Sequence, residues 1–406
     1  MQALNLNRST RTLSVGYFFS KCGEFAFETA FAVAVVSMTE ANLLLIGMVY
    51  FFRYLPSALF SPIGGWLADN CQKRRTLVGV ELAKSVLALA FLALFSFATP
   101  ALLVVIGLAM LMTALDCLYV PTFRAYFPDI VEKDRLSSVN SGVQVIEDIS
   151  SILGPLVFSA FALSLGSAVT FLFFAACLAL SAISIATLLP GKVSVPVAFD
   201  GRSVIRDALR SVGELRVGNA PLFAVICCTT LCAMFATSVI RFILPASVLE
   251  HFGSEAAVGY VFSLLAAGTV LGGMLYTRLN RQTTARLVLR YWALYGALFF
   301  AAAIALQFHS WLFLAILFVV GFVGAFVDIA IVTNIQCLSD DRQVGRNFSL
   351  YYFTAVIGDA VSGLIASLVF LLAGPATFIW MTLMLFVAPL RWNMKGSSDD
   401  AKHRAD

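Results

Sequence analysis

The sequence predicts an all-α membrane protein of twelve transmembrane helices in two six-helix halves. The first observation is composition: 60% of the residues are hydrophobic, 12% are charged, and the mean hydropathy is +0.91. Such a chain is too apolar to fold in water around one core. The second observation is that apolar runs, each long enough to cross a hydrocarbon layer of about 30 Å, recur from one end to the other. The third is that the two halves resemble each other.

Each predicted helix is an apolar run bounded by turn-forming or charged residues. Thr99-Pro100, Pro190-Gly191 and Gly374-Pro375 separate neighbouring runs, as expected of residues that end helices. A span needs roughly 20 apolar residues. The predicted helices cover residues 13–37, 42–69, 76–98, 101–123, 138–165, 167–189, 220–247, 256–279, 287–307, 311–335, 345–372 and 375–391.

Lysine and arginine gather in every second loop, and this asymmetry predicts the orientation of the chain. Loops on the cytoplasmic side of a membrane accumulate these residues. The segments before the first helix and after every even-numbered helix are basic, whereas the other loops hold only Glu40, Glu250, His251, Glu255 and His309 as charged or titratable residues. We therefore expect both termini in the cytoplasm.

The longest polar segment divides the chain into two bundles. We expect an N-terminal six-helix bundle at 1–189, a cytoplasmic linker at 190–219, and a C-terminal bundle with its tail at 220–406. Within the linker, the arginines recur at helical spacing, which is typical of a helix that lies on the membrane surface, although a plain linker is the alternative. Gly64-Gly65-x-Leu67 is echoed by Gly272-Gly273-x-Leu275, so a duplication of six helices follows.

One short motif after the second predicted helix resembles a known family. Residues 65–77 read Gly-Trp-Leu-Ala-Asp-Asn-Cys-Gln-Lys-Arg-Arg-Thr-Leu and are similar to the G-x-L-a-D-r-x-G-r-k-x-x-l motif of the major facilitator superfamily. Asn70 replaces the usual arginine and Gln72 the second glycine. The resemblance implies the major facilitator fold and transport by alternating access.

Two further stretches resemble the third drug:proton antiporter family of that superfamily, the group that includes the enterobactin exporter and macrolide efflux proteins. Residues 124–141 resemble its P-x-L-V-x-x-x-x-L-x-x-A-N signature through Pro128, Leu136 and Asn140. Residues 336–350 resemble its Q-x-x-x-P…G-R-v-x-s-l loop, although no proline stands at the usual place. Gly154-Pro155 is similar to the start of an exporter motif whose trailing glycines are missing here.

The motif at 65–77 also has a physical interpretation. Asp69, at a helix end, can set its carboxylate against the positive N-terminus of a neighbouring helix, a contact worth roughly 1 kcal/mol. We expect this contact only while the cytoplasmic side is shut, which makes it a latch; the alternative is that the cations are a topology signal alone. The predicted gating residues are Gly65, Asp69, Lys73, Arg74, Arg75, Gly345 and Arg346.

Charged residues inside the predicted helices cost about 2.5–3.5 kcal/mol each at the membrane centre, so each needs a reason. Most fall on helices that line the central cavity in the family's architecture. The expected proton-coupling residues are Glu24, Glu28, Asp148 and Asp359, and the expected substrate-binding residues are Lys21, Arg53, Glu147, Arg241 and Phe25.

Structural alternatives exist for these charges. Arg53 paired with Glu24 or Asp148 would be a buried ion pair without a binding role. Glu81 and Lys84, three residues apart in the third predicted helix, can satisfy each other. Small-residue spacings such as Gly268-x-x-x-Gly272 and Gly321-x-x-Gly324 are typical of helices that approach closely.

The leading functional hypothesis is proton-coupled efflux of an amphipathic small molecule, an anion such as a siderophore or a drug-like compound. A lysophospholipid carrier of the same superfamily is the alternative. We expect no enzyme activity and no cofactor, because phosphate-binding, metalloprotease and triad motifs are not visible and the eight Cys and three His lack metal-ligand spacing. The expected partners are substrate, protons and membrane lipid, not nucleic acid, and we expect a monomer in the bacterial inner membrane.

Overall fold

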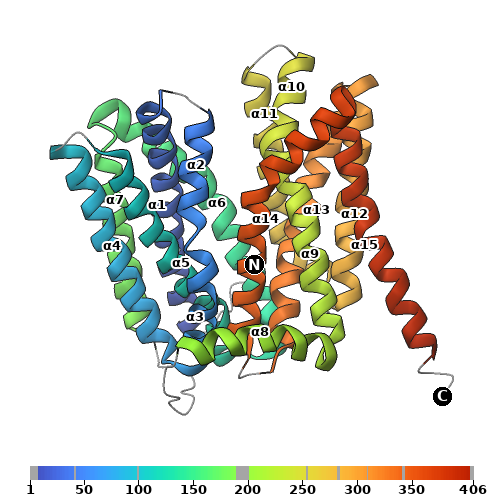
Figure 1. The fold of residues 1–406 in the computed structure, drawn as a ribbon, viewed down its shortest axis with the longest axis horizontal. Coiled ribbons are helices and arrows are strands. Elements are labelled where there is room, and N and C mark those ends of the chain that lie inside the picture. The colour runs from blue at the N-terminus through green and yellow to red at the C-terminus, as the bar shows by residue number, and fades with distance from the viewer. Residues whose placement is uncertain are drawn as a thin grey trace. The chain divides into compact units, whose positions relative to one another are not determined.

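The computed structural model describes residues 8–40, 43–97, 100–188, 201–252, 255–280, 284–308, 310–340 and 343–402, and the regular structure in these ranges is helical (Figure 1). The chain divides into two compact units. The first contains Met1–Arg210 together with Ser339–Phe353, and the second contains Ser211–Leu338 together with Thr354–Asp406. A short segment from the second half of the sequence thus belongs to the first unit.

The helices of the first unit follow the predicted apolar runs with one interruption. The run predicted at 42–69 is two helices, because Pro56 stands directly before the second of them, where its ring fixes the backbone and removes a donor. The bounds are α1 (Arg8–Met38), α2 (Leu43–Tyr54), α3 (Ser57–Asn70), α4 (Lys73–Phe97), α5 (Leu102–Ile130), α6 (Leu136–Ser164) and α7 (Val169–Ala186), with a 3₁₀ turn at Lys133–Arg135 before α6.

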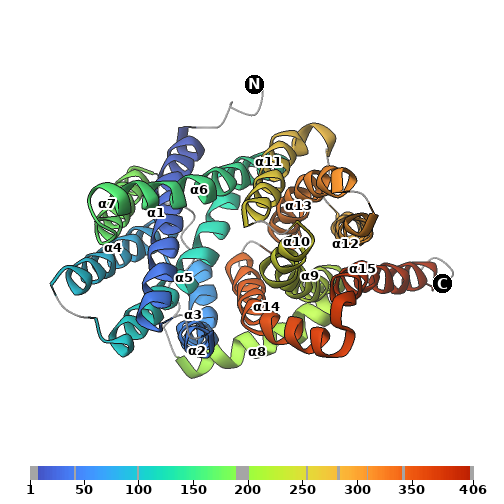
Figure 2. The ribbon, with the colours of Figure 1, turned by 90° about the horizontal axis from the view of Figure 1, so that it is seen from above.

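Helix α1 occupies the middle of the first unit. It packs against α6 and α7, while α4 packs against α7 and α5, and α3 against α5 (Figure 2). A cluster of buried aromatic rings joins these helices: Phe27 of α1 lies 4.9 Å from Phe174 of α7 and 5.2 Å from Phe91 of α4, measured between ring centroids. Close packing of large rings fixes the relative positions of α1, α4 and α7.

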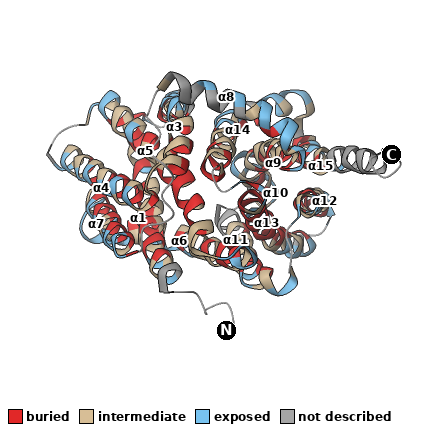
Figure 3. Cartoon of the chain, turned by 90° about the horizontal axis from the view of Figure 1, so that it is seen from below, coloured by how far each residue is buried: buried red, intermediate tan, exposed pale blue. Residues whose placement is uncertain are grey.

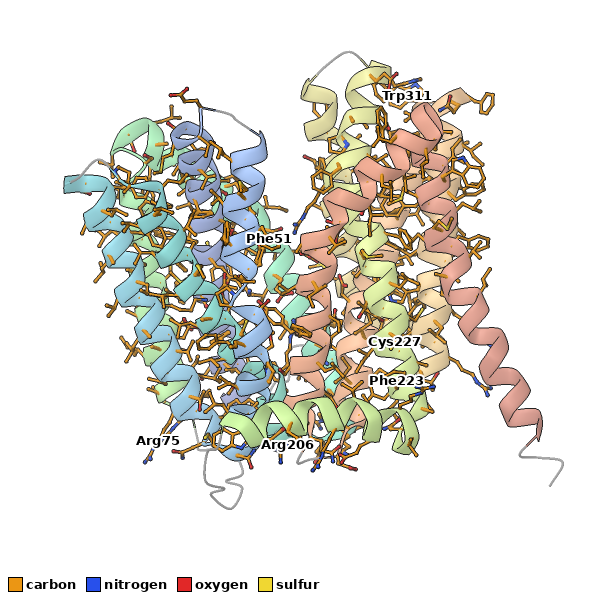
Figure 4. The ribbon with its side chains drawn as sticks, in the orientation of Figure 1. Phe51, Arg75, Arg206, Phe223, Cys227 and Trp311 are labelled. Carbon is orange, nitrogen blue, oxygen red and sulfur yellow. The ribbon has the colours of Figure 1, made fainter. Side chains whose placement is uncertain are left out.

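The linker contains one described helix, α8 (Gly201–Gly218), and the boundary between the units falls inside it. Its described residues Arg206 and Arg210 are exposed, and Arg206 lies at the same end of the first unit as Arg75 (Figure 4). The predicted linker begins at residue 190, and residues 189–200 lie outside the described ranges.

The second unit repeats the helical pattern but contains an irregular turn. The run predicted at 220–247 passes through a π-helical turn at Val239–Ile243, between α9 (Ala220–Ser238) and α10 (Leu244–Phe252). The remaining helices are α11 (Glu255–Leu279), α12 (Ala285–Phe308), α13 (Ser310–Leu338), α14 (Val344–Ala373) and α15 (Thr377–Lys402), with a 3₁₀ turn at Gly374–Ala376. The first turns of α14 belong to the first unit and the rest of the helix to the second.

Glycines bring α11 and α13 into direct backbone contact. A Cβ added to Gly268 or Gly272 of α11 would stand 2.1 Å or 2.3 Å from a carbonyl oxygen of α13, and one added to Gly321 would stand 2.1 Å from the carbonyl oxygen of Leu265. No side chain fits at such distances. The prediction of close helix approach is confirmed for Gly268, Gly272 and Gly321, whereas a Cβ on Gly324 would meet the Tyr295 ring of α12 at 3.2 Å.

Eight helices among the described residues are long and apolar enough to cross a membrane, with a shorter apolar helix at Thr377–Leu390. The predicted count of twelve spans stays a prediction, since α1 carries five charged residues and the second predicted span is divided. Outward faces are apolar: α4 exposes Leu82, Val86 and Leu89 along one side, whereas buried residues line α1, α5 and α7 within the unit (Figure 3). Such faces suit contact with lipid.

Substituting Gly321 by alanine should destabilise the second unit, because the added methyl group meets the Leu265 carbonyl. We expect a loss of about 1–3 kcal/mol, the usual cost of overpacking. Gly358→Ala is the matched control, since its Cβ would meet Met234 at an ordinary 3.5 Å. Thermal unfolding of the purified variants in detergent measures both, and equal melting temperatures would contradict the packing described here.

Candidate functional site: paired charges inside the helices

Lys21 and Glu24 form an ion pair along one face of α1. Their spacing of three residues brings the side chains together, and Lys21 Nζ lies 2.7 Å from Glu24 Oε1. Both side chains are partly buried. A predicted substrate-binding cation and a predicted coupling carboxylate are therefore direct partners.

Arg53 of α2 pairs with Glu28 of α1. Both terminal nitrogens of the guanidinium donate to the carboxylate, one of them to Glu28 Oε2 at 2.8 Å. The guanidinium is also 4.7 Å from the ring centroid of Phe31 and 5.5 Å from that of Tyr54, which suits the delocalised cation. Two parallel hydrogen bonds and the neighbouring aromatic rings hold the Arg53 side chain in one position. The structure thus gives Arg53 a different partner from the Glu24 or Asp148 that the sequence suggested.

Lys84 of α4 connects three helices of the first unit. Its Nζ lies 2.5 Å from Asp116 Oδ1 of α5 and 3.6 Å from Glu24 Oε2 of α1. Glu81, which the sequence paired with Lys84, instead accepts a hydrogen bond of 2.9 Å from Ser181 of α7. Sequence spacing found Glu81 and Lys84 but not their partners, because those partners stand on other helices.

Glu147 and Asp148 of α6 are adjacent in sequence but bind different groups. Glu147 accepts a hydrogen bond from the Tyr17 hydroxyl and lies 3.2 Å from Arg124 of α5. Asp148 accepts a hydrogen bond of 3.1 Å from Gln144, one turn earlier. The sequence did not assign Tyr17 or Arg124 to the site.

Phe25 lies against α6. A Cβ added to Gly154 would be 2.4 Å from the Cβ of Phe25, so the glycine makes room for that residue. The exporter-like Gly154-Pro155 pair therefore marks a close crossing of α1 and α6. Binding of substrate by Phe25 stays a prediction.

In the second unit, Arg241 lies on the π-helical turn and pairs with Asp359 of α14. Arg241 Nη2 is 3.3 Å from Asp359 Oδ2, and Thr237 donates to Asp359 Oδ1 at 3.0 Å. The arginine side chain is 54% exposed and the aspartate side chain 34%, so this pair is more open than Arg53, which is 4% exposed. Extra residues in a helical turn change the direction of side chains, and such turns recur at functional sites.

Asp69 at the end of α3 binds the start of α14 within the first unit. Asp69 Oδ1 accepts a hydrogen bond of 2.7 Å from the Gly345 amide, and Oδ2 accepts one of 2.9 Å from the Arg346 amide. These N–H groups stand in the first turn of α14, where no earlier helical carbonyl can serve them. The carboxylate also lies at the positive end of the helix, so charge and hydrogen bonding act together.

Small residues permit this contact. A Cβ added to Gly345 would be 2.3 Å from Ala68 Cβ, and one added to Gly65 would be 2.8 Å from Ser349 Cβ. The Ser349 hydroxyl donates to the backbone carbonyl of Ser61, which adds a second link between the two helices. The predicted gating residues Gly65, Asp69, Gly345 and Arg346 thus come together, although their role in gating stays a prediction.

The three adjacent cations of the motif have three different environments. Lys73 is buried and its Nζ lies 2.8 Å from Asp129 Oδ2 of α5. Arg74 donates to the carbonyl oxygen of Leu188 at 2.7 Å, and Arg75 is exposed. Lys73 therefore links α4 to α5, and Arg74 links α4 to Leu188, which follows the end of α7. Arg75 makes neither contact and is exposed. The sequence did not identify Asp129.

Replacing Lys73 by methionine should destabilise the first unit, because Asp129 would stay buried without its partner. Loss of one member of a buried pair costs roughly 3–5 kcal/mol. Arg75→Met removes the same charge from the same loop and should leave the melting temperature unchanged. Equal effects of the two substitutions would show that the cations act through their charge alone.

The described residues contain no group of three or more His, Cys, Asp or Glu that could hold a metal ion. The arrangement consists instead of cation–carboxylate pairs. Such pairs can exchange partners with an anion or take up a proton, since either event changes the charge of one member.

Comparison with known proteins identifies the family of the chain. The sequence profile of a family described as MFS transmembrane secretion effector matches residues 6–391. Macrolide efflux protein A of Streptococcus pyogenes is 25% identical over 241 residues, an alignment that covers 57% of this chain and 57% of that protein. The chain therefore matches less than two thirds of that relative's length.

Solved structures share the fold at low sequence identity. A bacterial homologue of the iron transporter ferroportin, solved in an outward-facing state, has a TM-score of 0.76 and 16% identity, covering 97% of this chain and 100% of that one. The human organic anion transporter MFSD10 has a TM-score of 0.75 and 15% identity, covering 95% of this chain and 99% of that one. At these identities the likeness establishes the fold.

Proposed function

Because the chain belongs to the MFS transmembrane secretion effector family, we propose that it is a proton-coupled antiporter that exports an amphipathic organic anion, such as a siderophore or a drug-like acid. The family and fold are those of multi-pass membrane transporters, not of enzymes. The efflux protein among its relatives supports the export direction. The proposed location is the cytoplasmic membrane of a bacterium, with both termini in the cytoplasm.

The observation that carries the proposal is how the charges pair. Each of the three predicted substrate-binding cations contacts one predicted coupling carboxylate: Lys21 with Glu24, Arg53 with Glu28 and Arg241 with Asp359. An anionic substrate and a proton would therefore act on the same ion pairs, one competing for the cation and the other neutralising the carboxylate. A site shared by both ligands would couple the binding of one to the release of the other.

The contact between Asp69 and α14 supports alternating access. It joins residues that are 276 positions apart in the sequence, through hydrogen bonds that need no side chain from α14. In the proposed cycle this contact forms when the cytoplasmic side closes and breaks when it opens. The contact therefore contributes to the balance between the two states rather than to substrate affinity.

Asp69→Asn should reduce transport strongly while leaving expression and substrate binding nearly intact. The amide keeps one oxygen acceptor but loses the second acceptor and the charge that face the two N–H groups. Asp134→Asn, which neutralises an exposed carboxylate in the 3₁₀ turn before α6, is the control. Transport at the wild-type rate by Asp69→Asn would exclude the latch.

Arg241 is the cation best placed to hold a substrate anion, because its pair with Asp359 is half-exposed and its planar fork suits carboxylates. The organic anion transporter with a similar fold gives a precedent for this substrate class. Arg53, buried and bonded twice to Glu28, would serve the same anion only after that pair separates.

Arg241→Gln and Arg53→Gln should weaken binding of transported anions by at least tenfold, which is about 1.4 kcal/mol, with Arg241→Lys retaining part of the affinity. Competition binding to purified protein measures this, with carboxylate drugs, catecholate siderophores, lysophospholipids and cationic dyes as probes. Transport of only neutral or cationic compounds, together with unchanged affinity in Arg53→Gln, would refute the anion proposal. Preference for lysophospholipids would assign the chain to the lipid carriers.

Proton coupling is assigned to the carboxylates of α1 and α6, chiefly Glu24 and Asp148, with Glu28 and Asp359 as further candidates. The available energy is sufficient: a proton crossing about 150 mV releases roughly 3.5 kcal/mol, and one pH unit adds about 1.4 kcal/mol. An anion that leaves the cell is also driven outward by the membrane potential. One proton per substrate is therefore enough.

Reconstituted vesicles test the coupling and its direction. Substrate should move against the proton gradient in the wild type, and Glu24→Gln or Asp148→Asn should abolish accumulation and flatten its dependence on pH. Glu214→Gln, an exposed carboxylate on α8, is the control. Movement of substrate and protons in the same direction would contradict antiport, and unchanged accumulation in both variants would place coupling elsewhere.

A further inference from the structure

Three carboxylates share two lysines in the interior of the first unit. Lys84 contacts Asp116 and Glu24, Lys21 contacts Glu24, and Glu81 stands one helical turn before Lys84. If all five side chains were ionised, the cluster would carry one excess negative charge. An uncompensated charge in an apolar interior is costly, and a group there becomes neutral instead.

The groups around the cluster do not supply the missing positive charge. Arg53 is paired with Glu28, and Arg124 with Glu147, so each of these cations is already balanced. The other titratable groups bordering the cluster are phenols and thiols, which are neutral near pH 7. They are Tyr17 and Cys22 of α1, Cys117 and Tyr119 of α5, Cys177 of α7 and Tyr352 of α14.

Glu81 is the carboxyl group in surroundings suited to the neutral form. Its side chain is fully buried, and Ser181 donates to Oε1, whereas Oε2 is buried without a hydrogen-bond partner among the described residues. The hydroxyl groups of Ser20 and Tyr119 border Glu81, and their oxygens are likewise buried without a partner in the described part of the chain. Each hydroxyl can donate to an ionised Oε2 or accept from a protonated one, so the hydroxyls fit either state of Glu81. The neutral form is favoured by burial and by the ion pairs of Lys84, which in the described residues go to Asp116 and Glu24 and not to Glu81.

We propose that Glu81 is a buried proton-binding site, occupied while Glu24 and Asp116 are ionised on the two lysines. Its part in transport rests on the proposed function. Lys84 contacts Glu24 and lies one turn from Glu81, so loss of the Glu81 proton would draw Lys84 from Glu24. Glu24 would then keep only Lys21 as its cation and bind a proton more readily. Glu81 of α4 is thus a proton-binding group in addition to the proposed coupling carboxylates of α1.

Infrared spectroscopy of the purified full chain tests the proton directly. A protonated carboxylic acid has a carbonyl band separate from those of carboxylates and amides, and the band shifts in D₂O. The wild type should show this band near neutral pH, with a further shift when glutamate, but not aspartate, carries a ¹³C carboxyl label. The band that responds to the glutamate label should be absent in Glu81→Gln and unchanged in Glu214→Gln.

Glu81→Asp keeps the test decisive even where Glu81→Gln fails to fold. In this variant the band should respond to ¹³C-aspartate and no longer to ¹³C-glutamate. A band that still responds to the glutamate label would place the proton on another carboxyl, and a wild type without any such band would overturn the proposal. Since the band needs no substrate, this outcome is independent of whether the protein exports an anion.

Discussion

The carboxylate of Asp69 meets two amide groups that have no other helical acceptor, and this interaction brings a distant segment of the chain into the first unit. Gly345 and Arg346 stand at the start of α14, where a helix offers unpaired donors and a positive dipole end. Gly65 and Gly345 have no side chains and so permit the approach. A carboxylate at the end of α3 thereby becomes a structural link to residues 339–353.

The same requirement, that a buried charge or donor must be matched, explains the ion pairs within the helices. Lys84 holds α4 to α1 and α5, and Arg53 holds α2 to α1. Breaking a buried pair by removing one member is costly because it leaves an uncompensated charge, whereas a charge that exchanges one partner for another stays compensated. An interior built from such pairs is stable in each of its pairings and can still respond to an arriving anion or proton. The proposed proton on Glu81 follows from the same requirement, because the three carboxylates around Lys84 outnumber the two lysines.

Much of the fold could be predicted from the sequence, because membrane helices are specified by local composition and by Lys and Arg in the loops. The spacing of Gly268 and Gly272 indicated a close helix approach, although not that α13 is the partner of α11. The division of the second predicted span at Pro56 was not, since membrane helices often continue through proline. The π-helical turn that carries Arg241 has no signature in residue type or spacing.

The sequence predicted which residues form the candidate site but not which of them contact each other. Residue type and place on expected cavity-lining helices singled out Lys21, Glu24, Arg53 and Glu28, but which carboxylate meets Arg53 depends on how α1 and α2 turn against each other. Lys84 was assigned to Glu81 because sequence spacing reveals neighbours on one helix only. Asp69 was the exception, since its position at a helix end and the motif around it both indicated a helix N-terminus as its partner.

Hydrogen exchange at the start of α14 tests the central claim, that Asp69 holds the Gly345 and Arg346 amides. First-turn amides normally exchange quickly because no carbonyl within the helix protects them. We predict slow exchange at these two positions in the wild type and in the control Asp134→Ala, and fast exchange in Asp69→Ala, with the later turns of α14 unaffected. Equally slow exchange at Gly345 and Arg346 without the Asp69 carboxylate would contradict the account.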